Sequence, residues 1–346
     1  MEFLGNKTSL LPAIREMVSQ HASAGSTVAD VFSGTATVSS ALREDGYSVH
    51  ANDLLPLCAM WASARLLVDP DPRFAGLEQL VGPLGGDPYA TVRHQLSNLI
   101  PVEGWVASNY TPLSSRTQGV ERRYLTVENG KAIDAARLQI QAWRNALTDS
   151  EHALLLASLV EGIVSVSNVA GTYGCYLKEW KGRALQRFSM VDIRPGTGTS
   201  VGHIVTCVDA EQAVSETQAS LIYADPPYTK RQYAAYYHLL NSVVGDGDPI
   251  IKGSTGLPRW QEWSSEWCYS RRAPDALDRL VGKSSAPVFM LSYSSDGHIS
   301  HDTILTTLTA YGRVEIREME RKRFKSSMRT HSATSVIERL YVMTRC

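Results

Sequence analysis

Two parts of the chain carry short apolar runs of the length that is typical of β-strands. Before residue 58 the runs cover 28–32 and 48–51, with a segment of helical periodicity between them. After residue 200 the runs cover 202–207, 221–223, 288–292, 314–319 and 336–343. A strand, a turn of small residues and a helix form the first βα unit of nucleotide-type α/β folds. The pattern therefore predicts an α/β fold with a Rossmann-like sheet.

The part between these runs is mainly helical in pattern. From about residue 62 to 198 apolar positions recur at the helical period. The most apolar stretch, 152–170, includes Glu161 and Asn168 and is predicted to be a buried helix rather than a membrane span. One face of another predicted helix carries Ile133, Ala136, Ile140, Trp143 and Leu147.

Three tryptophans in the segment 246–283 have a spacing that suits one helix face. They are Trp260, Trp263 and Trp267. An aromatic stripe at this period usually faces a protein interior, so core packing is favoured over contact with DNA.

A short polar motif follows the apolar run 221–223. It consists of Asp225, Pro226, Pro227 and Tyr228. The prolines fix φ and remove two backbone donors, so the nearby carbonyls remain available as rigid acceptors. A carboxylate and a carbonyl can accept hydrogen bonds from an exocyclic amino group, and a tyrosine ring can stack on a planar base. The motif suggests adenine or cytosine as substrate, whereas the plainer interpretation is a proline turn that ends a strand.

The first predicted turn has the features of a cofactor site. Asp30 precedes it, Gly34 lies within it, and Asp53 ends the second strand about 20 residues later, where such folds bind ribose hydroxyls. Neither glycine-rich phosphate-binding motif is present around Gly34. The turn therefore suits a cofactor with an ammonium and a carboxylate, such as S-adenosylmethionine, although ordinary packing gives similar turns.

Composition agrees with a cytoplasmic α/β protein. The 346 residues are 43% hydrophobic, which is enough for a large domain and a smaller one. The five cysteines form no C-x-x-C pair, so we expect reduced thiols and no metal site. An acid and a lysine interrupt the first residues, where a signal peptide would be apolar.

A set of short segments occurs in a fixed order along nearly the whole chain. They are residues 3–7, 30–37, 52–53, 124–131, 171–174, 176–178, 207–210, 225–228, 231–233, 237–240, 292–294 and 322–326. In this order they resemble the D12 class of DNA adenine-N6 methyltransferases, the α-group that includes the Dam-type enzymes. The chain departs from the family pattern at Asn6 and Ala36, where glycine is common.

The resemblance implies a domain organisation. Residues 1–58 and 200–346 would form the cofactor-binding catalytic domain, with a Rossmann-like S-adenosylmethionine-dependent methyltransferase sheet. Residues 59–199 would be an inserted helical target-recognition region, and 246–283 a smaller excursion within the catalytic domain.

The resemblance also implies roles for single residues. Asp225 and the Pro226 carbonyl would hold the target amino group beside Pro227, and Tyr228 would stack on the flipped base. Asp53 would bind the ribose and Asp209 the adenine of S-adenosylmethionine. The remaining cofactor contacts would come from Phe3, Gly5, Lys7, Asp30, Phe32 and Gly34.

A duplex-DNA enzyme that extrudes its target base also needs local positive charge. The net charge is only −1, but basic residues form four clusters with interleaved aromatic residues. One lies at 116–123, and another, at 178–187, includes Arg187. The alternative interpretation of each cluster is a solvent-exposed surface that binds nothing. The predicted DNA contacts are Tyr173, Lys178, Arg183, Lys230, Arg231, Arg323 and Lys325.

Three functions remain open from the sequence. The favoured one is a site-specific adenine-N6 methyltransferase that acts on duplex DNA in the cytoplasm, near the nucleoid of a prokaryote, with a restriction or defence subunit as a candidate partner. The second keeps the chemistry and acts on cytosine N4 or on adenine in RNA. The third is a DNA-binding or cofactor-sensing subunit without turnover.

Overall fold

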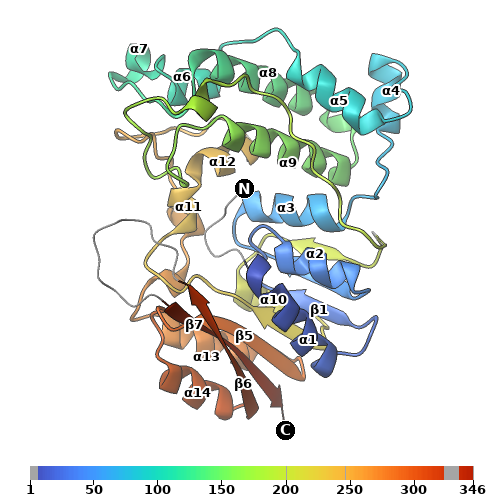
Figure 1. The fold of residues 1–346 in the computed structure, drawn as a ribbon, viewed down its shortest axis with the longest axis vertical. Helices are drawn as coiled ribbons and strands as arrows, with labels where there is room; N and C mark the ends of the chain where they lie inside the picture. Colours follow the sequence, from blue (N-terminus) through green and yellow to red (C-terminus); the bar gives the residue numbers. More distant parts are fainter. Residues whose placement is uncertain (1–6, 200, 246, 323–334, 346) are drawn as a thin grey trace. The chain divides into compact units, whose positions relative to one another are not determined.

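The computed structural model describes residues 7–199, 201–245, 247–322 and 335–345. They fall into two compact units (Figure 1). Within the described ranges, unit 1 takes in residues 55–201 and 233–264, and unit 2 takes in residues 7–54, 202–232 and 265–345. Residues 233–264, which the sequence boundaries assign to the catalytic domain, are thus grouped with unit 1.

Unit 2 is built on a seven-stranded sheet with the order β3-β2-β1-β4-β5-β7-β6. The strands from β1 to β5 are parallel where they pair, and β7 runs antiparallel to both β5 and β6. The strand bounds are Thr27–Asp30 (β1), Ser48–Asn52 (β2), Ile204–Thr206 (β3), Leu221–Ala224 (β4), Val288–Ser294 (β5), Gly312–Lys322 (β6) and Ser335–Arg345 (β7). The predicted Rossmann-like sheet is confirmed.

The order of the parallel strands places a topological switch between β1 and β4. From β1 the chain continues to β2 on one side, while β4 pairs with β1 on the other. Ligands of open α/β sheets bind at the carboxyl ends of the strands at such a point. All residues of β4 and β5 are buried, as expected for central strands covered on both faces.

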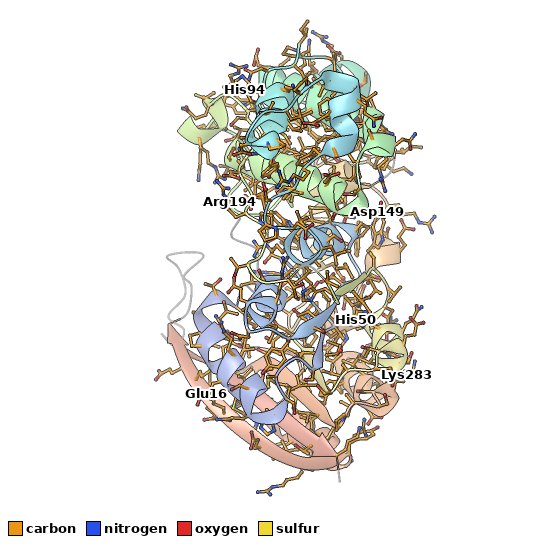
Figure 2. The ribbon with its side chains drawn as sticks, turned by 90° about the vertical axis from the view of Figure 1, so that its right-hand side faces the viewer. Glu16, His50, His94, Asp149, Arg194 and Lys283 are labelled. Atoms are coloured by element: carbon orange, nitrogen blue, oxygen red, sulfur yellow. The ribbon has the colours of Figure 1, made fainter. Side chains whose placement is uncertain are left out.

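Helices cover the two faces of this sheet (Figure 1). Their bounds are Thr8–Leu10 (η1), Leu11–His21 (α1), Thr37–Glu44 (α2), Ala210–Glu216 (α10), Glu266–Cys268 (η5), Ala273–Lys283 (α13) and His301–Thr309 (α14). Figure 2 labels Lys283 at the end of α13, where it forms an ion pair of 2.8 Å with Glu211 of α10. The same figure labels His50 on β2, whose ring bonds to Thr206 of β3.

Unit 1 is helical around its own apolar core. Its longest helix, α9 (Asp149–Ser165), begins with a capping box between Thr148 and Glu151 and buries most of its side chains. No helix of the described residues is long and apolar enough to cross a membrane. The other bounds are Pro56–Leu66 (α3), Ala75–Val81 (α4), Pro88–Ser97 (α5), Trp105–Tyr110 (α6), Ser114–Gln118 (α7), Val127–Ala142 (α8), Arg144–Ala146 (η2), Gly182–Leu185 (η3), Tyr233–Tyr236 (α11), His238–Val244 (α12) and Gln261–Trp263 (η4).

The three tryptophans do not share a helix, so that prediction is wrong. Trp260 is the N-cap of η4, which ends at Trp263, and Trp267 belongs to η5, with Ser264 and Ser265 in extended conformation between the two helices. Core packing is nevertheless confirmed, because the first two pack against the core of unit 1 and Trp267 is buried in the core of unit 2.

Candidate active site at the carboxyl edge of the sheet

The Asp-Pro-Pro-Tyr motif follows β4 directly, at the switch point of the sheet. Pro226 is buried, whereas Asp225 and Tyr228 are half-buried. The Tyr228 carbonyl accepts a hydrogen bond of 3.0 Å from the His298 backbone N–H. Its ring meets the Tyr293 ring edge to face, with centroids 6.0 Å apart. The motif is therefore fixed by covalent geometry and by contacts from the β5 side of the sheet.

Lys7 lies against this motif and is almost fully buried. Its Nζ is 3.0 Å from Asp225 Oδ1 and 3.8 Å from Glu338 Oε2. The ammonium also lies 5.4 Å from the centroid of the Tyr228 ring. Burial lowers the pKa of Lys7, but the Asp225 and Glu338 carboxylates outweigh it, and the pKa lies above the ordinary lysine value. Lys7 is therefore a charged group that holds the Asp225 carboxylate.

Glu338 is a site residue that the sequence analysis missed. It lies on β7 and is 4% exposed, which is unusual for a glutamate. In the sequence, the only indication of this role is that a single acidic residue stands inside the apolar run 336–343. Its position next to Lys7 depends on the antiparallel pairing of β7 with β5, which the run itself does not specify.

Asp30 is the last residue of β1 and is 1% exposed. Its Oδ2 accepts a hydrogen bond of 2.6 Å from Ser39 Oγ on α2. Its Oδ1 is buried and makes no hydrogen bond of normal geometry within the described part of the chain. Burial, followed by the nearby Asp225 and Asp53 carboxylates, raises the pKa of Asp30 to about 7 although Ser39 opposes this. Such an acceptor suits an incoming cation.

The turn after β1 is bonded to an acid that directly follows β2. The Gly34 N–H donates a hydrogen bond of 2.9 Å to Asp53 Oδ2. Gly34 has φ +52°, and a Cβ built there would meet nothing within 4 Å. Ala36, where the family pattern has glycine, adopts φ 55° as the N-cap of α2. The turn therefore keeps its left-handed conformation and leaves space beside its backbone.

Two further side chains, those of Phe32 and Asn52, connect this turn to neighbouring segments. The half-buried Phe32 ring meets the Trp267 ring edge to face, with centroids 5.5 Å apart. Asn52 joins the loops after β1 and β3, because its Nδ2 donates to the carbonyls of Val31 at 3.3 Å and Val208 at 3.1 Å.

Asp209 has a local structural role at the start of a helix. It is the N-cap of α10, and its Oδ1 accepts a hydrogen bond of 2.9 Å from the Glu211 N–H. The residue is exposed. Its predicted contact with the adenine of the cofactor remains a prediction.

The comparison with protein families decides the class of this site. Residues 3–303 match the family described as D12 class N6 adenine-specific DNA methyltransferase. The chain belongs to this family. The expected methyl donor of a D12-class chain is S-adenosylmethionine. No group of three or more histidines, cysteines or acids that suits a metal ion occurs in the described residues.

Individual relatives agree with this D12 assignment. The Type II methyltransferase M.FokI of Planomicrobium okeanokoites is 32% identical over 94% of this chain and 50% of its own length. Modification methylase StsI of Streptococcus sanguinis is 31% identical over 94% of this chain and 49% of its own length. The chain thus spans about half of these two relatives.

A relative of matching length is the Type II methyltransferase M.NlaIII of Neisseria lactamica. It is 31% identical over 100% of this chain and 99% of its own length. A solved SAM-dependent methyltransferase from Agrobacterium tumefaciens aligns with 98% of this chain and 61% of that chain, at 12% identity and a TM-score of 0.32. That structural likeness is too low to support an argument about this D12-class chain.

One predicted DNA contact of the D12-class chain is corrected by the structure. Tyr173 is among the DNA contacts predicted from the sequence, but its side chain is 2% exposed. Its hydroxyl is 2.8 Å from Ser167 Oγ, and its ring stacks near Tyr124 with centroids 6.2 Å apart. The prediction of a DNA contact by Tyr173 is therefore wrong, because the ring is packed in the core of unit 1.

The predicted cationic contacts that fall within the described residues are exposed but differ in their local bonds. Arg183 donates to the carbonyls of Ser167 and Val169, at 3.1 and 2.7 Å, and so braces its loop. Exposed positions are also found for Lys178, Lys230 and Arg231. The predicted site residues Phe3, Gly5, Arg323 and Lys325 lie outside the described residues.

Proposed function

We propose that this chain transfers a methyl group from S-adenosylmethionine to the N6 amino group of a specific adenine in duplex DNA. The observation that carries the proposal is Asp225, held by the buried Lys7 at the end of β4 and followed by two prolines and a half-buried tyrosine. D12-class membership supports adenine as the target base rather than cytosine. It likewise supports an enzyme rather than a sensing subunit.

The proposed chemistry begins with the target amino group. The lone pair of an exocyclic N6 is delocalised into the ring, so the nitrogen is a weak nucleophile. Asp225 and the Pro226 carbonyl would accept hydrogen bonds from its two hydrogens and favour a pyramidal nitrogen with a directed lone pair. Pro227 would keep this acceptor pair rigid, and Tyr228 would stack on the extruded base. Catalysis then depends on positioning and on preorganised polar groups.

Lys7 contributes through Asp225 in this proposal. Its position 3.0 Å from Asp225 Oδ1 favours the ionised carboxylate and fixes one of its oxygens. The family resemblance implies a cofactor contact for Lys7, whereas these contacts support a positioning role at the target amine. A cofactor contact by the same side chain stays a proposal.

The turn after β1 fits the expected cofactor. Asp30 Oδ1 is a buried acceptor that an ammonium group would satisfy, and the space beside Gly34 would admit a ligand to the backbone. Asp53, beside the same turn, would bind ribose hydroxyls, with Phe32 nearby and Asp209 at the adenine. When bound, S-adenosylmethionine supplies an electrophilic methyl group on a sulfonium. The chain would supply only the contacts that hold and orient this group.

Methylation of a base within a duplex requires that this base be flipped out of the stack. Exposed Lys178, Lys230 and Arg231 are proposed phosphate contacts, since phosphates are the main partners of such side chains. The relatives named as Type II or modification methylases support a proposed place in a restriction-modification system, with a cognate restriction enzyme as partner. Because its substrate would be chromosomal DNA, we place the protein in the cytoplasm beside the nucleoid.

The test is incubation of the purified chain with S-adenosylmethionine carrying a labelled methyl group and unmethylated duplex DNA, followed by nucleoside analysis. The proposal expects label in N6-methyladenine at one recurring sequence. Label in N4-methylcytosine, or label only when RNA is supplied, would replace it with the second function. Cofactor binding without any transfer would favour a sensing subunit.

A further inference from the structure

A tight turn at residues 252–257 of unit 1 has a closely defined backbone. Its first and last residues exchange two backbone hydrogen bonds of 2.9 Å. Gly253 and Gly256 adopt φ of +73° and +67°, a region that favours glycine. A Cβ built on Gly256 would lie 3.0 Å from Arg122 Nε, so the turn packs tightly on the side chain beneath it. The sequence and the packing therefore select one conformation of this turn.

The four successive carbonyls of residues 253–256 accept hydrogen bonds from buried side chains. Arg122, which is 1% exposed, donates to the first two carbonyls at 2.7 and 3.2 Å. The Tyr124 hydroxyl lies 3.0 Å from the third carbonyl, and the Tyr110 hydroxyl donates to the fourth at 2.7 Å. Both tyrosines are fully buried. The acceptors at the tip of the turn are thus directed toward the protein interior.

The donors of the turn are not used in this way. Lys252, Gly253 and Ser254 are exposed, and the N–H groups of the two latter residues bond to no described residue. The Lys252 ammonium forms no ion pair with a described carboxylate. The sequence has no acid from residue 249 to 261, whereas it has Lys252 and Arg259 there. The outer side of the turn is therefore positively charged, rich in donors and poor in acceptors.

The turn is tied to a segment that carries a proposed phosphate contact. The Tyr124 hydroxyl lies 3.0 Å from the carbonyls of both Thr255 and Tyr173. The preceding residue, Arg123, donates to the Lys178 carbonyl at 2.7 Å. One short loop thus holds the turn and the segment with the exposed Lys178 together. A duplex that contacts Lys178 would pass close to the turn.

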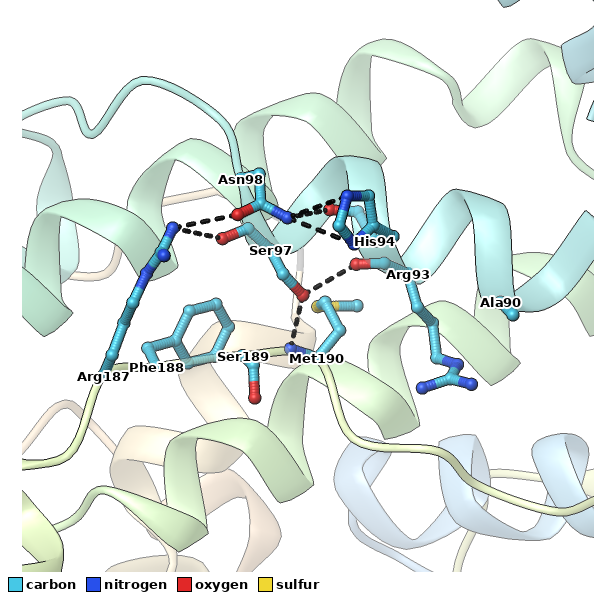
Figure 3. Close-up of a pocket in the computed structure, with 9 residues that line it drawn as sticks. All are labelled: Ala90, Arg93, His94, Ser97, Asn98, Arg187, Phe188, Ser189 and Met190. Carbon is cyan, nitrogen blue, oxygen red and sulfur yellow. Dashed lines mark hydrogen bonds between the residues drawn. The ribbon is translucent and has the colours of Figure 1, made fainter.

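The cavity of about 400 Å³ that α5 and the segment 187–190 border lacks such convergence (Figure 3). Arg187 donates to Asn98 Oδ1 at 3.0 Å, and the Arg93 guanidinium lies 4.8 Å from the centroid of the Tyr89 ring. Figure 3 shows the two arginine side chains pointing apart. The donors of this cavity therefore do not meet on one ligand, whereas those of the turn belong to consecutive residues.

We propose that the turn 252–257 reads a guanine of the recognition sequence in the major groove, with Lys252 and Ser254 as the contacting side chains. Guanine is the base whose major-groove edge presents two acceptors, N7 and O6, and no donor. This edge complements a surface that offers donors only from a preordered backbone, so little conformational entropy is lost on binding. The inference rests on the proposed function and adds sequence readout, which phosphate contacts do not supply.

The test compares the sequences that the full chain and its variants select from a library of random duplexes. We expect the unsubstituted chain to enrich a sequence that contains guanine, and Lys252→Met to lose about 10-fold of the preference at one guanine. Ser254→Ala should weaken the preference at the same position by less. Lys131→Met is the matched control, because Lys131 belongs to the same unit and pairs with Glu103 at 3.2 Å. It should select the original sequence.

Replacement of the identified guanine by 7-deazaguanine checks the contact itself, because it removes N7. We expect the affinity of the unsubstituted chain to fall about 10-fold, and the affinity of Lys252→Met to stay the same. An unchanged selected sequence in Lys252→Met would overturn the proposal, as would the lack of any enriched sequence with the unsubstituted chain. If that variant instead showed only a shallower salt dependence of affinity, Lys252 would be a phosphate contact and the proposal would be wrong.

Methyl transfer to the selected duplex is scored separately with labelled S-adenosylmethionine. Relaxed selection at one guanine by Lys252→Met, in a protein whose unsubstituted chain labels no adenine, would reject the proposed function and keep the reading turn. Labelled adenine with an unchanged selected sequence in Lys252→Met would keep the proposed function and reject the turn.

Discussion

Lys7 Nζ lies 3.0 Å from Asp225 Oδ1, so a lysine that precedes the first helix contacts the carboxylate that directly follows the central strand β4. The lysine is 4% exposed and has Glu338 as its second carboxylate partner at 3.8 Å. A buried cation between two acids links the stability of the sheet edge to the geometry of the proposed acceptor of the target amine.

Removal of Lys7 should therefore affect stability as well as turnover. Lys7→Met leaves the half-buried Asp225 and the buried Glu338 without their cation, and we expect a loss of about 3 kcal/mol in the free energy of unfolding. Glu338→Gln added to Lys7→Met should recover part of that loss. Urea unfolding measures both. The control is Lys283→Met, which breaks an exposed pair with Glu211 and should cost at most about 1 kcal/mol. Equal losses in both lysine variants would contradict the central role of Lys7.

Substitution of Tyr228 should separate stacking from hydrogen bonding. Tyr228→Ala removes the ring, and we expect kcat/KM for a duplex substrate to fall about 10- to 100-fold. Tyr228→Phe keeps the ring and should stay within about threefold of the original value. Equal losses in the two variants would assign the effect to the hydroxyl.

Asp30 should make cofactor affinity dependent on pH. Its pKa of about 7 reflects burial first, together with Asp225 and Asp53, while Ser39 opposes the shift. An ammonium ligand requires the ionised form, so we expect affinity for S-adenosylmethionine to rise about tenfold from pH 5.5 to 7.5. Asp30→Asn should bind more weakly and without this rise. A pH profile that is the same in both proteins would remove Asp30 from the cofactor site.

Asp30 also makes the stability of the ligand-free protein depend on pH. This dependence runs in the opposite direction to that of cofactor affinity. The pKa is raised above the value of 3.8 that describes an unperturbed aspartate, so the folded chain binds more protons than the unfolded chain between these two values. The contribution of Asp30 to the free energy of unfolding is therefore present at low pH and is lost as the pH rises toward 7. Asp30→Asn should lack this part of the pH dependence in urea unfolding.

Asp53 should act on the cofactor in two separable ways. It accepts the Gly34 N–H at 2.9 Å and is the proposed ribose ligand. Asp53→Asn retains one acceptor for Gly34 and should raise the cofactor dissociation constant about tenfold, whereas Asp53→Ala should raise it further and destabilise the turn by about 1 kcal/mol. Calorimetry with S-adenosylmethionine and with DNA checks this. A loss confined to DNA affinity would displace Asp53 from the ribose role.

The main parts of the fold were predictable because their signals are local. Each apolar run became a strand within a few residues of its expected bounds, and the helix face with Ile133 and Ile140 is buried as expected. Asp30 ends β1, and Asp53 and Asp225 directly follow β2 and β4, parallel strands whose carboxyl ends meet at one edge of a sheet. Their electrostatic effect on one another is therefore a consequence of strand order.

The unpredicted parts depend on contacts between distant segments. Glu338 reaches Lys7 only because β7 turns antiparallel beside β5. The tryptophan spacing suits a helix, but extended Ser264 interrupts it. The glycines around Tyr173 indicate a loop, yet the bond between its hydroxyl and Ser167 keeps the ring in the core. In each case tertiary packing overrides the local pattern.

The most direct test of the account compares Asp225→Ala with the original chain in a single-turnover methyl-transfer assay, with cofactor affinity measured on the same samples. The account predicts that transfer to adenine N6 falls at least about 10³-fold, because the acceptor that organises the amine is lost, while the S-adenosylmethionine dissociation constant changes less than about threefold. Transfer at an undiminished rate in Asp225→Ala would contradict the account.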